Sequence, residues 1–295
     1  MQQQRSINSF SSSDSWVILS EIEQSIKRKI EAVGTPLKDW DIKIYRGVLT
    51  GYNEAFIIST EKRNEILANC KNEQERTKTE ELIRPILRGR DIKRYGYDWA
   101  GLWLINTHNG IKGIKPRIDI NDYPAVKQHL DKYWDKISKR ADKGDTPYNL
   151  RNCAYVDDFN QPKIMWKIIG NRLAFAFDEN GVILNNACYL MTGECLPFLL
   201  AYLNSKAILW YSYITNMNPT GVGDSQVGAQ NMIKFPIPRN KVFQDKLSSL
   251  ILQQLTNVIS IETLDNLIER EIASFLNLNP DEIRFLSLFS HGLFK

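Results

Sequence analysis

The 295-residue chain has few of the residues that build metal and redox sites. Its three histidines, His108, His129 and His291, are widely spaced, which excludes a zinc finger and an H-E-x-x-H metalloprotease. Its four cysteines include no C-x-x-C pair and follow no secretory leader, so a disulfide framework is not expected. The sequence therefore offers no recognisable metal ligand set of its own.

Long hydrophobic segments are also missing. No uninterrupted apolar run approaches the roughly 20 residues that a membrane helix needs, and the mean hydropathy is −0.35. Residues 1–15 are rich in serine and lack the apolar stretch of a signal peptide, so they are expected to be a linker or the ragged end of a fragment. We expect a cytoplasmic protein without a membrane partner.

Motifs for stand-alone catalysis are missing as well. The glycine-rich segment Gly221–Gly228 fits neither G-x-G-x-x-G nor the P-loop, which favours a flexible loop. The N-P-P-Y-type tetrad of amino-methyltransferases is absent; Asn218–Gly221 shares only its first two residues and lacks the aromatic one. Two Asp-x-Lys pairs, Asp41/Lys43 and Asp91/Lys93, resemble part of a metal-dependent nuclease motif but are as many as chance predicts. We expect this chain alone not to be an enzyme.

The charge is unevenly distributed. Between Leu82 and Arg172 there are 18 Lys and Arg against 10 Asp and Glu, a surplus of +8, whereas the rest of the chain has a net charge of −4. A basic middle between acidic ends indicates an electropositive face for a polyanion such as nucleic acid. The alternative is a solvated helix face, because several of these lysines lie on one predicted helix.

The order of predicted elements indicates an α+β fold. Ser20 and Glu23 form a capping box before an amphipathic helix, and Ile42–Ile58 predicts a strand, a glycine-bounded turn and a second strand. Helices are expected at 61–83, about 122–141 and 196–214, and further strands at 102–105, 163–169, 173–177, 182–184 and 188–191. Asp178–Gly181 is expected to be a hairpin turn.

This order lacks regular βαβ alternation, which favours a mixed, largely antiparallel sheet with packed helices and a C-terminal helical segment. The domain boundaries that follow are a recognition domain at 16–240 and a helical segment packing on it at 241–295.

Cations and hydrogen-bonding groups gather on the predicted turns. Arginine matches phosphate oxygens and the O6/N7 edge of guanine, and asparagine matches the N6/N7 edge of adenine. This mixture of residue types therefore suits base reading better than a surface covered with lysines, which would contact only phosphates. The competing interpretation is that pairs such as Arg90–Asp91 only hold the loops together. The candidate DNA-binding residues are Arg46, Thr50, Tyr52, Asn53, Arg88, Arg90, Lys93, Arg94, Lys112, Lys115, Arg140, Lys143 and Arg172.

Four blocks, in order, resemble one protein family. Ile44–Ile58 is similar to the opening signature of the C-terminal specificity domain of TaqI-like adenine methyltransferases and Eco57I-like type IIG restriction–modification enzymes. Ile83–Tyr95 resembles the second block, Leu200–Lys206 the leucine-asparagine-serine helix, and Leu264–Ile283 the closing segment. The central region, roughly 110–161, is not matched, and its candidate contacts depend on charge alone.

The resemblance implies a target-recognition domain that binds double-stranded DNA in a cleft shared with an N-terminal methyltransferase domain. No cofactor is expected in this fragment, whereas S-adenosylmethionine, and Mg²⁺ if the parent enzyme also cuts, would serve the full-length protein.

Two other functions stay open. One is a Mg²⁺-dependent nuclease fragment that uses Asp91 and Lys93. The other is an assembly module similar to type I specificity subunits, in which Leu250, Leu264, Leu267 and Ile268 serve either the core or a partner.

Overall fold

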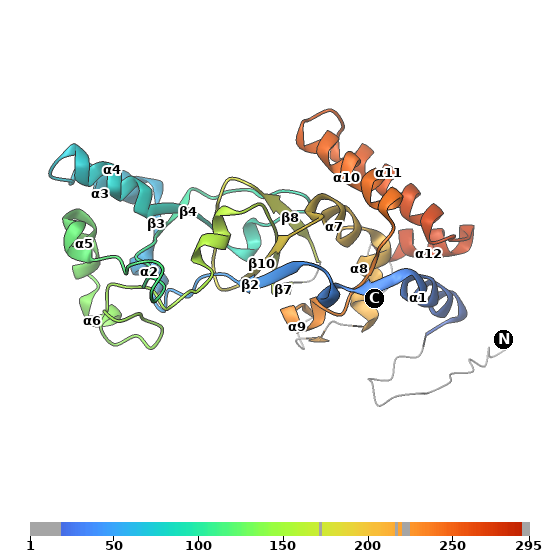
Figure 1. Cartoon of the computed structure of the whole chain (residues 1–295), viewed down its shortest axis with the longest axis horizontal. Helices are drawn as coiled ribbons and strands as arrows, with labels where there is room; N and C mark the ends of the chain where they lie inside the picture. Colours follow the sequence, from blue (N-terminus) through green and yellow to red (C-terminus); the bar gives the residue numbers. More distant parts are fainter. Residues whose placement is uncertain (1–18, 171–172, 216–217, 220–224, 291–295) are drawn as a thin grey trace. The chain divides into compact units, whose positions relative to one another are not determined.

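The computed structural model describes residues 19–170, 173–215, 218–219 and 225–290 (Figure 1). The expected linker at 1–15, Arg172 and most of the glycine-rich segment, 221–224, lie outside these residues. The chain divides into two compact units: unit 1 consists of 1–42, 170–173 and 193–295, and unit 2 of 43–169 and 174–192. The boundary expected at 240/241 stays a prediction.

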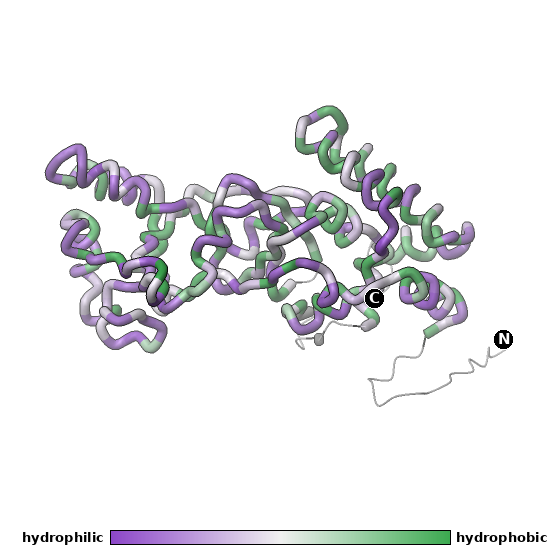
Figure 2. Tube along the Cα trace, in the orientation of Figure 1, coloured by the Kyte–Doolittle hydropathy of each residue, from purple (hydrophilic) through white to green (hydrophobic). Residues whose placement is uncertain are grey.

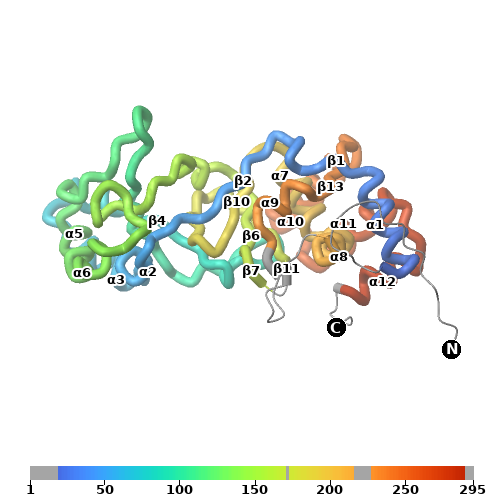
Figure 3. The backbone as a smooth tube through the Cα atoms, turned by 90° about the horizontal axis from the view of Figure 1, so that it is seen from below, coloured from blue at the N-terminus to red at the C-terminus, as the bar shows by residue number. Residues whose placement is uncertain are grey.

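Unit 2 is built on two four-stranded sheets. The first has the order β2-β10-β6-β8 and consists of β2 (Ile42–Arg46), β10 (Cys188–Gly193), β6 (Lys163–Lys167) and β8 (Phe175–Asp178). The second has the order β3-β5-β4-β9 and consists of β3 (Ile57–Ser59), β5 (Leu102–Ile105), β4 (Ile83–Leu87) and β9 (Ile183–Leu184). Figure 3 shows β2, β10 and β6 running side by side.

Antiparallel pairing predominates, as expected. Met165 of β6 faces Leu190 of β10 on one side and Ala176 of β8 on the other, and all three side chains are buried. In the second sheet β3–β5 and β5–β4 are antiparallel, while β4 and β9 are parallel. The predicted α+β class is confirmed.

The turn at Asp178–Gly181 joins the two sheets instead of closing a hairpin. Because β8 pairs with β6 and β9 pairs with β4, the expected hairpin between 173–177 and 182–184 is wrong. The Asp178 carboxylate accepts from the backbone N–H groups of Asn180, Gly181 and Val182 at 3.1–3.2 Å, and Gly181 adopts φ +77°. The turn chemistry was readable from sequence, but the strand partner depends on distant residues.

The Lys163–Asp178 ion pair anchors this turn in the interior. Both side chains are fully buried, Lys163 Nζ lies 2.5 Å from Asp178 Oδ2, and it also donates to the Phe159 carbonyl at 2.6 Å. Tyr97 completes the set by donating its hydroxyl to Asp178 Oδ1 at 2.9 Å. A buried charge is tolerated when it is paired and its remaining sites are hydrogen-bonded, as here.

The helices of unit 2 are shorter than the periodicity predicted. Residues 61–83 form two helices, α3 (Thr60–Ala68) and α4 (Glu73–Leu82), because Asn72 caps α4 by accepting from the Glu75 N–H. The expected helix at 122–141 is likewise two, α5 (Pro124–Asp131) and α6 (Trp134–Ile137).

Four short helices complete unit 2 in the described residues. They are α2 (Asn53–Phe56), η2 (Gly89–Asp91), η3 (Ile120–Asp122) and η4 (Val156–Asn160).

Unit 1 is mainly helical. Its first helix, α1 (Glu21–Val33), begins with the predicted capping box: the Ser20 side chain accepts from the Glu23 N–H, and the Glu23 side chain accepts from the Ser20 N–H. The expected single helix at 196–214 is broken at Ser205, whose hydroxyl accepts from the Ile208 N–H and starts a second helix. The other main elements are β1 (Gly34–Pro36), α7 (Leu196–Leu203), α8 (Lys206–Thr215), β13 (Pro236–Pro238), α10 (Lys241–Leu255), α11 (Ile261–Phe275) and α12 (Pro280–Ser290).

The C-terminal helices are amphipathic and carry their apolar residues toward their neighbours. Figure 2 shows hydrophobic and hydrophilic residues alternating along α10 and α11. Leu264 and Ile268 are buried, which assigns them to the core, whereas Leu250 and Leu267 are half-buried. Within the described residues, no helix is both long enough and apolar enough to cross a membrane.

Candidate functional site

The Asn185–Ala187 loop of unit 2, between β9 and β10, is where the first two blocks meet. The Gly47 N–H donates to the Cys188 carbonyl at 2.9 Å and the Val48 N–H to the Leu184 carbonyl at 2.8 Å, so the end of β2 lies against this loop. A Cβ on Gly47 would come within 2.0 Å of the Asn185 carbonyl oxygen. Only glycine permits so close an approach, and it leaves Arg46 beside the loop.

The second block reaches the same loop from the other sheet. The Asn185 N–H donates to the Leu87 carbonyl at 3.0 Å. A Cβ on Gly89 would lie 3.2 Å from Lys167 Cβ and 3.7 Å from the Ala187 carbonyl oxygen, so η2 packs against the end of β6 and the loop. Arg46 and Arg90 are therefore each next in sequence to a glycine that packs against this loop.

Three cations lie at or next to the residues that contact this loop. Arg46 and Arg90 are exposed and Lys167 is half-buried, and none of them forms an ion pair with a described residue. The Arg46 Nε–H donates to the Asn186 carbonyl at 2.8 Å, which fixes the side chain and leaves its terminal nitrogens unused. Lys167 was not among the candidates, because only the folded structure brings it next to Gly89.

Arg88 is less available. Its guanidinium donates to both carboxylate oxygens of Asp91 at 2.8–3.0 Å, and the Arg88 N–H also donates to Asp91. Burial acts to raise the pKa of Asp91, but the hydrogen bonds from Arg88 outweigh it and hold that pKa below its usual value. This pair shapes η2 and thereby presents Arg90.

Lys93 and Arg94 lie on the turn that follows. The Tyr95 N–H donates to the Phe175 carbonyl at 2.7 Å, with Tyr95 at φ +69°, so this turn is fixed along β8. The Arg94 guanidinium lies over the Tyr95 ring at 5.2 Å, and Lys93 forms a weak contact of 3.8 Å with Asp98.

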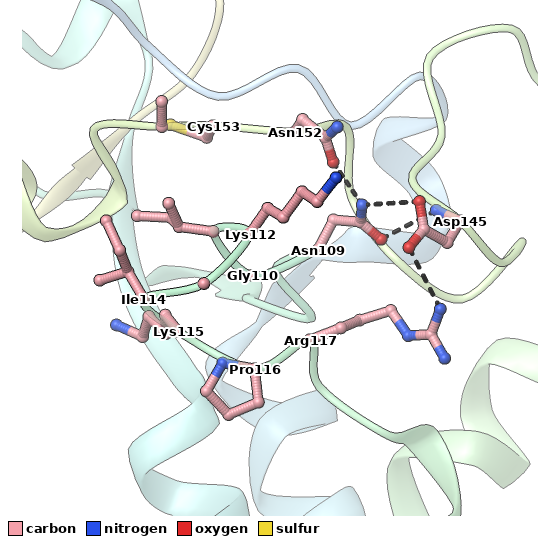
Figure 4. A pocket seen from close by; sticks show the side chains of 13 residues that line it. Asn109, Gly110, Lys112, Ile114, Lys115, Pro116, Arg117, Asp145, Asn152 and Cys153 are labelled. Carbon is pink, nitrogen blue, oxygen red and sulfur yellow. Dashed lines mark hydrogen bonds and ion pairs between the residues drawn. The ribbon is translucent and has the colours of Figure 1, made fainter.

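Lys112 and Lys115 belong to a second group, around a hollow of about 700 Å³ (Figure 4). Lys115 is paired with Asp157 at 2.5 Å, whereas Lys112 is exposed and unpaired among the described residues. Asn109 holds the hollow together by accepting from the Asp145 N–H at 2.8 Å and donating to the Asp145 carboxylate at 3.0 Å.

Tyr155 connects the hollow with the loop. Its ring stacks on Tyr45 with centroids 4.3 Å apart, directly before Arg46 in β2. Burial, together with Cys153, which lines the hollow, raises the pKa of Tyr155 to about 12, while Arg46 acts in the opposite direction. The three free cations of the loop and the unpaired Lys112 thus belong to connected parts of unit 2.

The turn at Thr50–Asn53 is directed toward α6 instead. Thr50 was expected to contact DNA. In the structure it is buried and donates its hydroxyl to Asn53 Oδ1 at 2.5 Å, so its side chain is not offered to a ligand. Tyr52 is half-buried, hydrogen-bonds to Glu54 and lines a separate hollow with Lys136 and Arg140.

Arg140 was expected to contact DNA, but the structure uses it in the interior. Its guanidinium is buried and donates to the carbonyls of Thr50, Pro147 and Asn149, and it lies 4.3 Å over the Phe56 ring. Burial lowers the pKa of Arg140 to about 10. Lys143 is exposed and donates to the Ser138 carbonyl at 2.8 Å.

The site so described consists of cations without an ion pair to a described residue, on loops that connect the strands of an α+β core. Within the described residues, no three His, Cys, Asp or Glu side chains lie together as metal ligands. The chain belongs to the family of TaqI-like C-terminal specificity domains, whose model matches residues 84–237.

Two solved structures with a similar fold are restriction–modification enzymes. The type IIL enzyme MmeI in complex with DNA has a TM-score of 0.55 at 15% identity over 88% of this chain, and the type IIG endonuclease BpuSI has 0.51 at 14% over 90%. This chain spans about a third of each of those proteins, 34% and 32%. No curated protein sequence matches the chain.

Proposed function

We propose that this chain is the sequence-specific DNA recognition domain of a type IIG-like restriction–modification enzyme. The observation that carries the proposal is that Arg46, Arg90 and Lys167 lie at or next to the residues that pack against the Asn185–Ala187 loop, and that none of them forms an ion pair with a described residue. Cations without partners attract phosphates, and a side-chain amide among them adds the means to read a base. MmeI was solved in complex with DNA, and its fold supports the same ligand here.

In the proposed parent enzyme, an N-terminal adenine-specific methyltransferase domain receives the target adenine, flipped from the duplex, while residues 16–240 read the site and 241–295 pack against them. S-adenosylmethionine, and Mg²⁺ for cleavage, belong to that parent enzyme.

The nuclease alternative has little support from Asp91. Its carboxylate is buried, and both of its oxygens accept hydrogen bonds from Arg88, whose positive charge opposes a metal ion at the same place. Supercoiled plasmid should stay intact when the chain is incubated with Mg²⁺.

The experiment is a titration of a fluorescent DNA duplex with the chain at fixed salt, read by anisotropy. Arg46→Ala and Arg90→Ala should each weaken binding several-fold. Arg76→Ala, an exposed arginine on α4 next to Glu80, is the matched control and should bind as wild type does. Equal affinity for all four proteins would refute the proposal.

A further inference from the structure

We infer that Asn186 reads a base, with Arg46 as its neighbour in the same contact; the inference rests on the proposed function. The two asparagines of the Asn185–Ala187 loop have different roles in the structure. Asn185 Oδ1 accepts from the Ala187 N–H at 3.2 Å and from the Cys188 thiol at 3.5 Å, which closes the loop on itself. Asn185 is therefore used in shaping the loop.

The Asn186 side chain is left unused. It is half-buried, and its carboxamide forms no hydrogen bond with a described residue. Its nitrogen and oxygen are also not among the buried side-chain atoms that lack a partner, so the carboxamide is open to water and to a ligand.

Arg46 and Asn186 are held together by the backbone. The bond from Arg46 Nε–H to the Asn186 carbonyl oxygen does not involve the Asn186 side chain. It therefore fixes the guanidinium at the backbone of Asn186, and both the terminal guanidinium nitrogens and the carboxamide stay without a bond to a described residue. Gly47 makes this arrangement possible, because any side chain there would meet the Asn185 carbonyl oxygen.

The two edges suit adjacent base pairs in the major groove. An asparagine carboxamide donates to N7 and accepts from N6 of adenine, and an arginine presents two donors to O6 and N7 of guanine. Phosphate gripping alone would need no carboxamide acceptor, since phosphate oxygens only accept. Asn186 accordingly specifies an adenine, whereas Lys167 and Arg90 contribute affinity without specificity.

The test is selection of binding sites from a randomised duplex library by the 295-residue chain, followed by affinity measurements on every single-base variant of the selected site. Asn186→Ala removes the carboxamide but keeps the carbonyl that holds Arg46. It should lower discrimination at one A·T pair by roughly 5- to 150-fold and leave the other positions unchanged. Asn121→Ala, an exposed asparagine whose side chain donates to Asp119, is the control and should keep the full motif.

Three results would decide against the inference or its basis. Unchanged discrimination at every position in Asn186→Ala would overturn the reading role. An equal loss of affinity for all duplexes would assign Asn186 to phosphate contact and overturn it as well. If the wild-type chain selects no motif, the proposed function itself fails, whatever the variant does.

Discussion

The buried Lys163–Asp178 pair gives the sharpest test of how the fold supports the site. Lys163→Met keeps a chain of similar length but removes the ammonium that lies 2.5 Å from Asp178 and 2.6 Å from the Phe159 carbonyl. Asp178 would remain buried as a carboxylate without a cation. Breaking such a pair costs about 3–5 kcal/mol. Because Tyr97 and three backbone N–H groups still donate to Asp178, we expect about 3 kcal/mol.

The assay is urea unfolding of wild type and variant, followed by circular dichroism and by tryptophan fluorescence. Fluorescence is informative because Trp166 is buried in β6, the strand that contains Lys163. Asp178→Asn and the double variant complete a cycle that isolates the coupling between the two side chains. A loss of less than about 0.5 kcal/mol in Lys163→Met, the size of an ordinary surface substitution, would refute the reasoning.

Three further predictions concern the loops. Gly47→Ala should cost about 1–3 kcal/mol of stability and weaken DNA binding because its Cβ would clash with the Asn185 carbonyl, whereas Gly96→Ala, with nothing within 4 Å, should change neither in the same unfolding and anisotropy assays. Asp91→Asn should lower the free energy of unfolding by about 1–3 kcal/mol at neutral pH. Since the pKa of Asp91 is depressed in the folded state, the difference in unfolding free energy from wild type should be constant above about pH 5 and shrink as the pH falls below about 4. A difference that grows on acidification would contradict this. Arg140→Met should destabilise the chain by about 2–4 kcal/mol, as three carbonyls lose their donor, and a variant as stable as wild type would place Arg140 outside the core.

Features set by local chemistry were predictable from the sequence. The capping box at Ser20 starts α1 where expected, because its partner is only three residues away. The break between helices α7 and α8 at Ser205 had an equally local cause, since this serine caps α8. The apolar residues on both sides concealed it in the sequence.

Features set by distant partners were not predictable. Asp178–Gly181 has the composition of a hairpin turn, yet β9 pairs with β4, which lies about a hundred residues earlier in the chain. From its sequence alone, Arg140 is expected to be exposed, as a cation on an amphipathic segment. In the structure it is buried, because the carbonyls of Thr50 and Asn149 accept hydrogen bonds from its guanidinium.

The candidate site was half predictable for the same reason. Arg46 and Arg90 carry a signal, since each lies next to a glycine in a matched block. Lys167 and Asn186 carry none in their local sequence and become candidates only because Gly47 and Gly89 pack against the loop that contains Asn186.

The central claim is that Lys167 and Arg90, beside the Asn185–Ala187 loop, bind the phosphates of a DNA duplex, and the salt dependence of binding measures this most directly. The slope of log K against log salt should become shallower by about 1 for Lys167→Ala and by about 2 when Arg90 is replaced as well. If the double variant keeps the wild-type slope, these cations do not contact the backbone of the duplex and the account is wrong.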